Sequence, residues 1–253
     1  FKDQVCFMVH CGSRGLGHQV CTDYVSTMNP VMQKYSIKLP DRELACCPIR
    51  SPEGENYLGA MAAAANFAFA NRQCITHFIR QVVKKLFGTD THLKLIYDVA
   101  HNMAKFEIHM VDGKEQSVLV HRKGATRAFP GGRKELAEVF SKTGQPVIIP
   151  GDMGRASYVL VGTERALEET FGSVCHGAGR LMSRTQARQG RDSRDVISKL
   201  KARGVIARAS SREGLTEEVP EAYKSIDDVI AAVTDAGLAR KVARLRPVGV
   251  VKG

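Results

Sequence analysis

The apolar positions along the chain predict its elements before any chemistry is considered. Residues 4–10, QVCFMVH, alternate and predict a strand that ends at His10. Residues 93–101 predict a second strand with His101 at its end, and residues 106–111 and 116–123 predict two more. Asp112 and Gly113 between the last two are typical of a hairpin turn. The segments PVIIPGDMG and ASYVLVGT predict another strand, turn and strand.

The strongest helix signal covers residues 51–88. Ser51 is a suitable N-cap, Pro52 stands at the first helical position, and Gly88 is a C-terminal stop. The glycine-rich stretch CGSRGLGHQV is expected to be a loop that leads into a helix, and the pattern from Glu164 is mostly helical up to a last short strand, RPVGVVKG. Strands followed by helices, without regular alternation, predict an α+β fold of mixed or antiparallel sheets with packed helices, in a single domain over residues 1–253.

Composition restricts the class of protein. The 253 residues are 43% hydrophobic and 25% charged, which is enough to bury a core. The longest nearly apolar run, LGAMAAAANFAFA, is too short to span a bilayer, and no segment resembles a signal peptide. Seven cysteines without regular spacing favour a reducing compartment, so we expect a cytoplasmic protein. The chain begins without methionine in strand-like sequence, so we expect a domain that lacks its N-terminal part.

Positive charge is concentrated in one stretch. The net charge is +11, and residues 180–212 hold ten cations against Asp192 and Asp195. Clustered arginine favours a phosphate-bearing partner, because the guanidinium group matches phosphate oxygens. The alternative is a solvated helix face that only aids solubility. The stretch offers no aromatic platform on which single-stranded bases would stack.

Glycines surround charged side chains in three further loops. In HCGSRGLG, residues 10–17, backbone N–H groups and Arg14 can hold an anion at a helix N-terminus, although such loops are common. HRKGATRAF, residues 121–129, is either a nucleotide contact or a basic hairpin end. PGDMGRASY, residues 150–158, is either a ligand-binding turn with Ser157 as a hydroxyl or a structural turn.

Histidines carry the candidate chemistry. His10 and His101 at strand ends suit metal binding, and the alternative is two ordinary histidines at the edge of the core. In VCHGAGR, a helix starting near His176 would place Arg180, Arg184 and Arg188 on one face behind it. Transfer of a phosphoryl group to an imidazole needs such cations. The alternative is a helix N-terminus with a surface arginine stripe.

Taken in order, these motifs resemble the RtcB family of RNA-splicing ligases. The motifs are VHCGSRGLGHQ, YDVAHNMAKFE, HRKGATRAF, PGDMGRASYVLVGT, CHGAGR and RPVGVVKG, and they extend from the first residues to the last. The resemblance implies an enzyme that uses GTP and Mn²⁺ to join RNA 2′,3′-cyclic phosphate or 3′-phosphate ends to 5′-hydroxyl ends. Its substrates would be tRNA halves or broken RNA, and archease would be an activating partner.

The resemblance also implies roles for single residues. His176 would be the nucleophile that becomes guanylylated, and His10 and His101 would be Mn²⁺ ligands. Arg14, Arg180 and Arg184 would hold RNA phosphates. The residues implied to hold the guanine nucleotide are Asn102, Pro150, Gly151, Asp152, Met153, Ser157, Gly177, Ala178, Gly179, Tyr223 and Lys252.

Two departures from the family pattern change these expectations. Asp152 stands where many relatives carry Ser or Thr, so backbone N–H groups would have to make the contact there. The remaining metal ligands of the family come from sequence before the position that matches residue 1, so only part of the metal site is expected. A non-catalytic RNA-binding module that uses residues 180–212 is the main alternative, and a metal-dependent phosphatase or nuclease is the third hypothesis.

Overall fold

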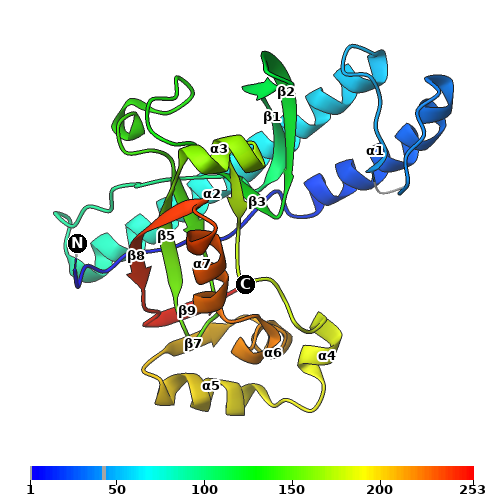
Figure 1. Cartoon of the computed structure of the whole chain (residues 1–253). Helices are drawn as coiled ribbons and strands as arrows, with labels where there is room; N and C mark the ends of the chain where they lie inside the picture. The colour runs from blue at the N-terminus through cyan, green and yellow to red at the C-terminus, as the bar shows by residue number, and fades with distance from the viewer. Residues whose placement is uncertain (1, 42–43) are drawn as a thin grey trace. The chain divides into compact units, whose positions relative to one another are not determined.

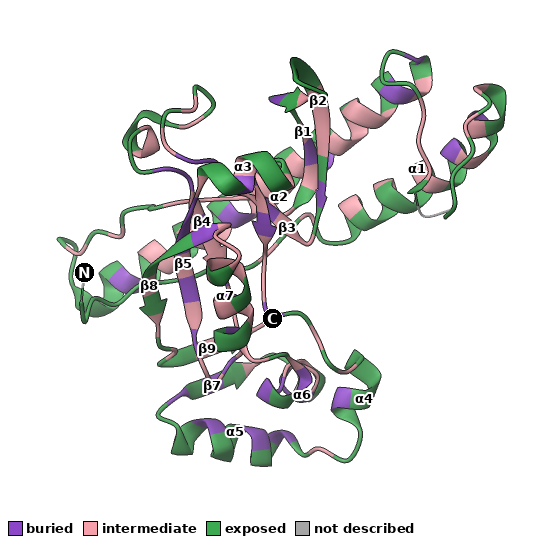
Figure 2. Ribbon diagram, in the orientation of Figure 1, coloured by how far each residue is buried: buried purple, intermediate pink, exposed green. Residues whose placement is uncertain are grey.

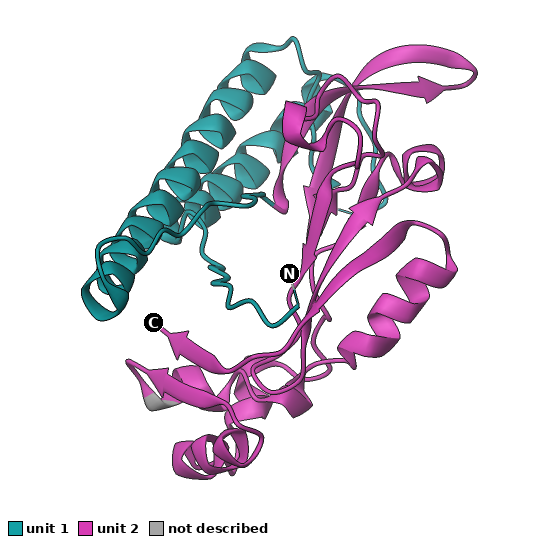
Figure 3. Ribbon diagram, turned by 90° about the vertical axis from the view of Figure 1, so that its left-hand side faces the viewer, with its two compact units in different colours: residues 1–100 teal, residues 101–253 magenta. Residues whose placement is uncertain are grey.

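The chain has two compact units, residues 1–100 and 101–253 (Figure 3). The computed structural model describes residues 2–41 and 44–253. The fold is α+β, as the sequence predicts, with helices and mostly antiparallel strand pairs (Figure 1). The expectation of a single catalytic domain over residues 1–253 stays a prediction.

Two helices dominate the first unit. They are α1 (Gly15–Lys34) and α2 (Pro52–Phe87). The predicted boundaries of α2 are confirmed, because the Ser51 hydroxyl accepts a hydrogen bond from the Gly54 N–H and Gly88 ends the helix with a φ of 99°. The helices meet through Lys34 and Glu53, whose side chains form a 2.9 Å ion pair. Among the described residues, no helix is long and apolar enough to cross a membrane.

Two predicted strands in this part of the chain are wrong. Residues 4–10 and 93–100 have no regular secondary structure, and residue 101 is a bend. A strand needs a neighbour for its backbone hydrogen bonds, and none of the described sheets includes either segment. His10 and His101 therefore do not end strands. His101 instead precedes a strand that begins at the next residue.

Four small sheets form the second unit. The predicted hairpin is confirmed as β1 (Asn102–Val111) with β2 (Lys114–Lys123), and the predicted strand, turn and strand as β4 (Pro146–Ile149) with β5 (Ser157–Gly162). The sequence pattern did not reveal β8 (Ala239–Leu245), which pairs with β5, or β7 (Ile206–Ala209), which runs parallel to β9 (Gly249–Lys252). The fourth sheet pairs β3 (Ala125–Arg127) with β6 (Ser173–Cys175).

Helices cover these sheets and bury two apolar clusters. The helical elements are α3 (Glu164–Thr170), α4 (Arg184–Arg188), α5 (Ser193–Ala202), α6 (Arg212–Thr216), α7 (Ile226–Asp235) and the 3₁₀ turns η2 (Glu138–Phe140) and η3 (Pro220–Ala222). One cluster packs β4 and β5 against α7, with Ile149, Leu160 and Ile230 fully buried (Figure 2). The other gathers apolar side chains of α5, α6 and η3 around Leu200.

The predicted helix at His176 is absent. His176 follows β6 directly, and the next helix, α4, begins only at Arg184 behind the N-cap Ser183. Gly179 has a φ of 70°, which a right-handed helix does not allow, and Arg180 forms a β-bridge with Tyr223. The stripe of His176, Arg180, Arg184 and Arg188 on one helix face is therefore wrong.

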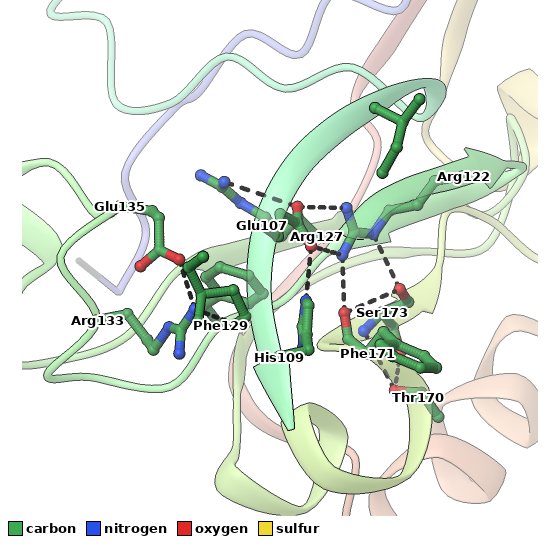
Figure 4. A network of polar contacts seen from close by, with 12 residues as sticks. Glu107, His109, Arg122, Arg127, Phe129, Arg133, Glu135, Thr170, Phe171 and Ser173 are labelled. Carbon is green, nitrogen blue, oxygen red and sulfur yellow. Dashed lines mark hydrogen bonds and ion pairs between the residues drawn. The ribbon is translucent and has the colours of Figure 1, made fainter. Parts of the chain in front are cut away.

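A buried charged network ties the β1–β2 hairpin to the segment that leads into β6. Glu107 of β1 is fully buried and accepts two hydrogen bonds from Arg122 of β2, at 2.7 and 2.9 Å (Figure 4). His109 Nε2 lies 3.0 Å from the same carboxylate. Arg122 also donates to the Ser173 hydroxyl at 2.9 Å and to the Phe171 carbonyl at 2.8 Å. The network fixes β6, which ends one residue before His176.

The charge of Glu107 depends on these partners. Burial alone would raise the pKa of Glu107, but the hydrogen bonds from Arg122 and His109 outweigh it and hold the pKa below the ordinary value of 4.5. A carboxylate with a lowered pKa stabilises the fold above its unfolded pKa and loses that contribution as the pH falls through its folded pKa. The network should therefore contribute fully at neutral pH.

Removing Arg122 should destabilise the second unit strongly. In Arg122→Met the Glu107 charge stays buried without its main partner, which costs about 3–5 kcal/mol of unfolding free energy at pH 7. The double variant Arg122→Met/Glu107→Gln should recover more than half of the loss, because no buried charge remains. Urea unfolding followed by circular dichroism measures both.

Arg165→Met is the matched control. Arg165 and Glu169 form an exposed pair within α3, so its loss should cost no more than about 0.5 kcal/mol. If Arg122→Met unfolds at the same urea concentration as Arg165→Met, the network does not hold the hairpin and β6 together.

Candidate active site

The peptide of Gly124 lies at the centre of the candidate site. Gly124 stands between β2 and β3, and β1 begins at Asn102 opposite Lys123. The Gly124 N–H donates to the His101 carbonyl oxygen at 2.9 Å and to Asn102 Oδ1 at 2.8 Å. The strand register therefore brings two residues implied by the resemblance to the same peptide.

His176 contacts the carbonyl group of the same glycine, in the peptide that joins Gly124 to Ala125. The pairing of Cys175 with Ala125 places His176 beside Gly124, and His176 Nδ1 lies 2.6 Å from the Gly124 carbonyl oxygen. A carbonyl oxygen only accepts hydrogen bonds, so Nδ1 carries the proton of this bond. In a neutral imidazole the proton on Nδ1 leaves a lone pair on Nε2. The contact with Gly124 therefore favours the tautomer in which Nε2 of His176 keeps its lone pair.

The close approach of His176 requires a glycine at position 124. A methyl group on Gly124 would lie 3.2 Å from Cε1 and 3.3 Å from Nδ1 of His176, and the residue has a φ of 67°. The ring of His101 stacks on that of His176, with centroids 4.3 Å apart and planes inclined by 30°. Ring stacking and the carbonyl contact together fix the orientation of the imidazole.

The turn between β4 and β5 holds a second group of the implied residues. Gly151 donates its N–H to the Ser157 hydroxyl at 3.3 Å, and a methyl group on Gly151 would lie 2.0 Å from the Ala156 carbonyl oxygen. The Asp152 side chain is fully buried and accepts from the N–H groups of Gly154 and Arg155 at 2.9 and 3.0 Å. Burial raises the pKa of Asp152 in spite of these bonds.

The side chains at two of these positions point away from any ligand that would lie at the turn. Asp152 is turned into its own loop, and Met153 is buried in the apolar cluster around Leu200. The backbone of the turn lies next to the loop that follows His176, because a methyl group on Gly177 would be 3.4 Å from the Pro150 carbonyl oxygen. Backbone groups are therefore what Pro150–Met153 can offer.

The loop after His176 then pairs with the segment around Tyr223. Ala178 is buried in the core, and Gly179 has open space where a side chain would stand. The Gly179 carbonyl accepts from the Lys224 N–H at 3.1 Å. This pairing places Tyr223 beside the loop that begins at His176.

Arg180 is held by internal partners. Its guanidinium group donates to the Glu217 carbonyl at 2.6 Å and to the Tyr223 hydroxyl at 2.9 Å, and it lies 3.2 Å from Glu218. Arg184, in contrast, is 70% exposed. Of these two predicted RNA-phosphate contacts, Arg184 is the one whose side chain faces solvent.

Glu218 is a residue that the sequence analysis missed. Its carboxylate accepts a hydrogen bond from the Tyr223 hydroxyl and lies 3.8 Å from Lys252 Nζ. Burial, together with Glu218, raises the pKa of Tyr223 to about 12, so the phenol stays protonated at neutral pH. An acidic pair, Glu217 and Glu218, beside a stretch with ten cations was the available signal in the sequence.

The last two predicted residues, His10 and Arg14, belong to the first unit. Both are exposed, and their loop is attached to α2. Asn71 donates to the Gly12 carbonyl at 2.9 Å, and Arg72 donates to the Cys11 carbonyl at 3.1 Å.

The residues present do not complete a metal site. Residues 2–41 and 44–253 contain no group of three His, Cys, Asp or Glu side chains arranged to hold a metal ion. His101 lies against His176 rather than within such a group.

Comparison with known proteins agrees with the motif pattern. A family model described as "tRNA-splicing ligase RtcB" matches residues 1–253. The chain is 55% identical over its whole length to a tRNA-splicing ligase RtcB of Archaeoglobus fulgidus, and 53% identical over 99% of its length to one of Methanococcus maripaludis. It covers 53% of each of these two relatives, and 26% of a Pyrococcus furiosus relative to which it is 54% identical.

The chain thus spans about half the length, or less, of the curated relatives it matches. The match nevertheless covers every motif from the loop around Arg14 to the strand that holds Lys252. The chain belongs to the RtcB family of tRNA-splicing ligases.

Proposed function

We propose that this chain carries the nucleophile and the nucleotide-binding residues of a GTP-dependent RNA ligase. The ligase joins RNA ends that carry a 2′,3′-cyclic phosphate or a 3′-phosphate to ends that carry a 5′-hydroxyl. The observation that supports this most directly is the contact of His176 Nδ1 with the Gly124 carbonyl, because it leaves Nε2 with a lone pair. The names of the similar proteins support RNA as the substrate class.

In the proposed reaction, Nε2 of His176 attacks the α-phosphorus of GTP. A P–N bond forms, the bond from the α-phosphorus to its β-bridging oxygen breaks, and pyrophosphate leaves. An oxygen of the RNA 3′-phosphate then attacks the same phosphorus and releases His176, which yields an RNA end activated by GMP. A 2′,3′-cyclic phosphate is first opened by water to a 3′-phosphate. The 5′-hydroxyl finally attacks the activated phosphate, loses its proton, and displaces GMP.

The nucleotide is proposed to lie along the loop that follows His176. Gly177 and Gly179 leave space there, and the backbone of Pro150–Met153 lies beside it. Asn102, Ser157, Ala178, Tyr223 and Lys252 complete the proposed contacts. Arg184, together with Arg14, is proposed to hold RNA phosphates, and Arg180 acts through its bonds to Tyr223 and Glu218.

The remaining partners rest on the resemblance. Mn²⁺ is the proposed metal, with His10 and His101 as two of its ligands, and it would supply charge stabilisation at the phosphates. We also propose archease as an activating partner and the cytoplasm as the location.

His176→Ala tests the nucleophile. The gene's full-length product is incubated with GTP labelled at the α-phosphate and with Mn²⁺, and protein-bound label is measured after denaturation. The wild type should take up acid-labile label on His176, and His176→Ala should take up none. If His176→Ala is labelled as the wild type is, another residue is the nucleophile.

Label uptake by the wild type separates the ligase from its alternative. RNA affinity that falls with salt and survives in His176→Ala is expected of both. A wild-type protein that binds RNA but never takes up label is the non-catalytic RNA-binding module instead.

Gly124→Ala tests whether the Gly124 peptide orients the nucleophile. The added methyl group pushes against the His176 ring, so labelling should slow at least about tenfold because a displaced nucleophile loses its alignment. Gly113→Ala is the matched control, because Gly113 also has a positive φ, of 76°, but nothing within 4 Å of the added carbon. Equal labelling rates in the two variants would show that the imidazole does not depend on Gly124.

A further inference from the structure

One carboxylate is shared by four residues of the proposed site. Glu218 lies 3.2 Å from Arg180, 3.8 Å from Lys252 and 4.0 Å from Arg184, and it accepts a hydrogen bond from the Tyr223 hydroxyl. Two of these four residues are proposed to hold the guanine nucleotide and two were predicted to hold RNA phosphates.

Glu218 is fixed from its own backbone. Its side chain is 17% exposed, and the next residue, Val219, is buried in the apolar cluster around Leu200. On the other side, the Glu217 carbonyl accepts the 2.6 Å hydrogen bond from Arg180. The backbone on both sides of Glu218 is therefore held, which places its carboxylate beside Arg180 and Tyr223.

The order of donors and acceptors gives Tyr223 a single orientation. Arg180 donates to the Tyr223 oxygen at 2.9 Å, and the same hydroxyl donates its proton to Glu218. The Arg180 guanidinium also lies over the Tyr223 ring, 4.9 Å from its centroid. The Glu218 carboxylate is the charged acceptor at the end of these hydrogen bonds. Replacing it by an uncharged group therefore weakens the bond that orients the Tyr223 hydroxyl.

The carboxylate also balances the cations around it. Lys252 and Arg184 are 35% and 70% exposed, so without an anion between them their side chains would separate into solvent. Lys252 ends β9, whose parallel partner β7 lies in the same unit, so its backbone is fixed and only its side chain depends on Glu218. Each of these exposed ion pairs is weak, so they favour the observed positions of the charged atoms without fixing them.

We infer that Glu218 is a positioning residue that places Tyr223 and Lys252 for the nucleotide and aligns Arg180 and Arg184 with them. This inference rests on the proposed function. It adds that one carboxylate couples the nucleotide side of the site to the phosphate-binding side. Glu218 touches neither ligand and acts through the groups that do.

Two variants of the gene's full-length product test this inference. Glu218→Gln keeps the size of the side chain and removes its charge. Glu218→Asp keeps the charge but shortens the side chain by one methylene group. The charge balance is retained, whereas the carboxylate moves away from Tyr223 and Lys252. Both should raise the KM for GTP in the labelling reaction by about tenfold or more, because a hydrogen bond to a charged group is lost or stretched.

The labelling rate at saturating GTP should stay within about threefold of the wild type, because contacts made equally before and during the reaction affect KM alone. Glu221→Gln is the matched control. Glu221 is exposed, and its substitution removes the same charge three residues away from Glu218. Its KM should equal that of the wild type.

A second measurement does not use GTP. The ultraviolet absorbance of tyrosine, followed against pH, should show Tyr223 ionising at a lower pH in Glu218→Gln than in the wild type. The contribution of Tyr223 is identified by adding Tyr223→Phe to the wild type and to Glu218→Gln and recording which part of the absorbance change is lost. If Glu218→Gln takes up too little label for its KM to be measured, the titration still tests whether Glu218 holds the Tyr223 hydroxyl.

Each outcome has one meaning. A wild-type KM in both variants overturns any role of the Glu218 carboxylate in GTP binding. A wild-type KM in Glu218→Asp alone overturns positioning and leaves Glu218 as a charge-balancing residue. A loss that persists at saturating GTP overturns it as well. If the wild type itself takes up no label on His176, the proposed function fails and this inference falls with it, whereas a labelled wild type with unaffected variants contradicts the inference alone.

Discussion

The hydrogen bond from His176 Nδ1 to the Gly124 carbonyl oxygen determines what the candidate site can do. At 2.6 Å it fixes the tautomer of the imidazole, and with it the ring nitrogen that keeps a lone pair for the proposed attack on phosphorus. The N–H of the same glycine donates to the His101 carbonyl and to Asn102 Oδ1, so one glycine connects three residues implied to hold metal, nucleotide and the covalent intermediate. A side chain at position 124 would press on the imidazole, so this position requires glycine.

Buried charges hold the strands that make this bond possible. Arg122 joins Glu107 of the hairpin to the segment before β6, and β6 carries His176 to the Gly124 peptide. The partly buried Glu218 contacts Tyr223 and Lys252, and we infer that it positions both of them. His176 itself is oriented by uncharged contacts, the Gly124 carbonyl oxygen and the ring of His101.

The sequence predicted the parts of the fold that local patterns specify. The caps of α2 and the Asp112–Gly113 turn are local, and both are confirmed. The strand ending at His10 was wrong, because alternation alone does not supply a partner strand, and the helix at His176 was wrong, because the positive φ of Gly179 and the pairing of Arg180 with Tyr223 outweigh helical spacing. The role of Glu218 could not be predicted from local patterns, because its partners lie up to 38 residues away in sequence.

The tautomer of His176 is the most direct test of this account. Long-range ¹H–¹⁵N NMR correlations of the imidazole, assigned by their loss in His176→Gln, distinguish a ring nitrogen that carries hydrogen from one that does not. At a pH where His176 is neutral, the account predicts a protonated Nδ1 and an unprotonated Nε2, with Gly124→Ala shifting the pattern toward a mixture. A wild-type protein with hydrogen on Nε2 and a bare Nδ1 would contradict it.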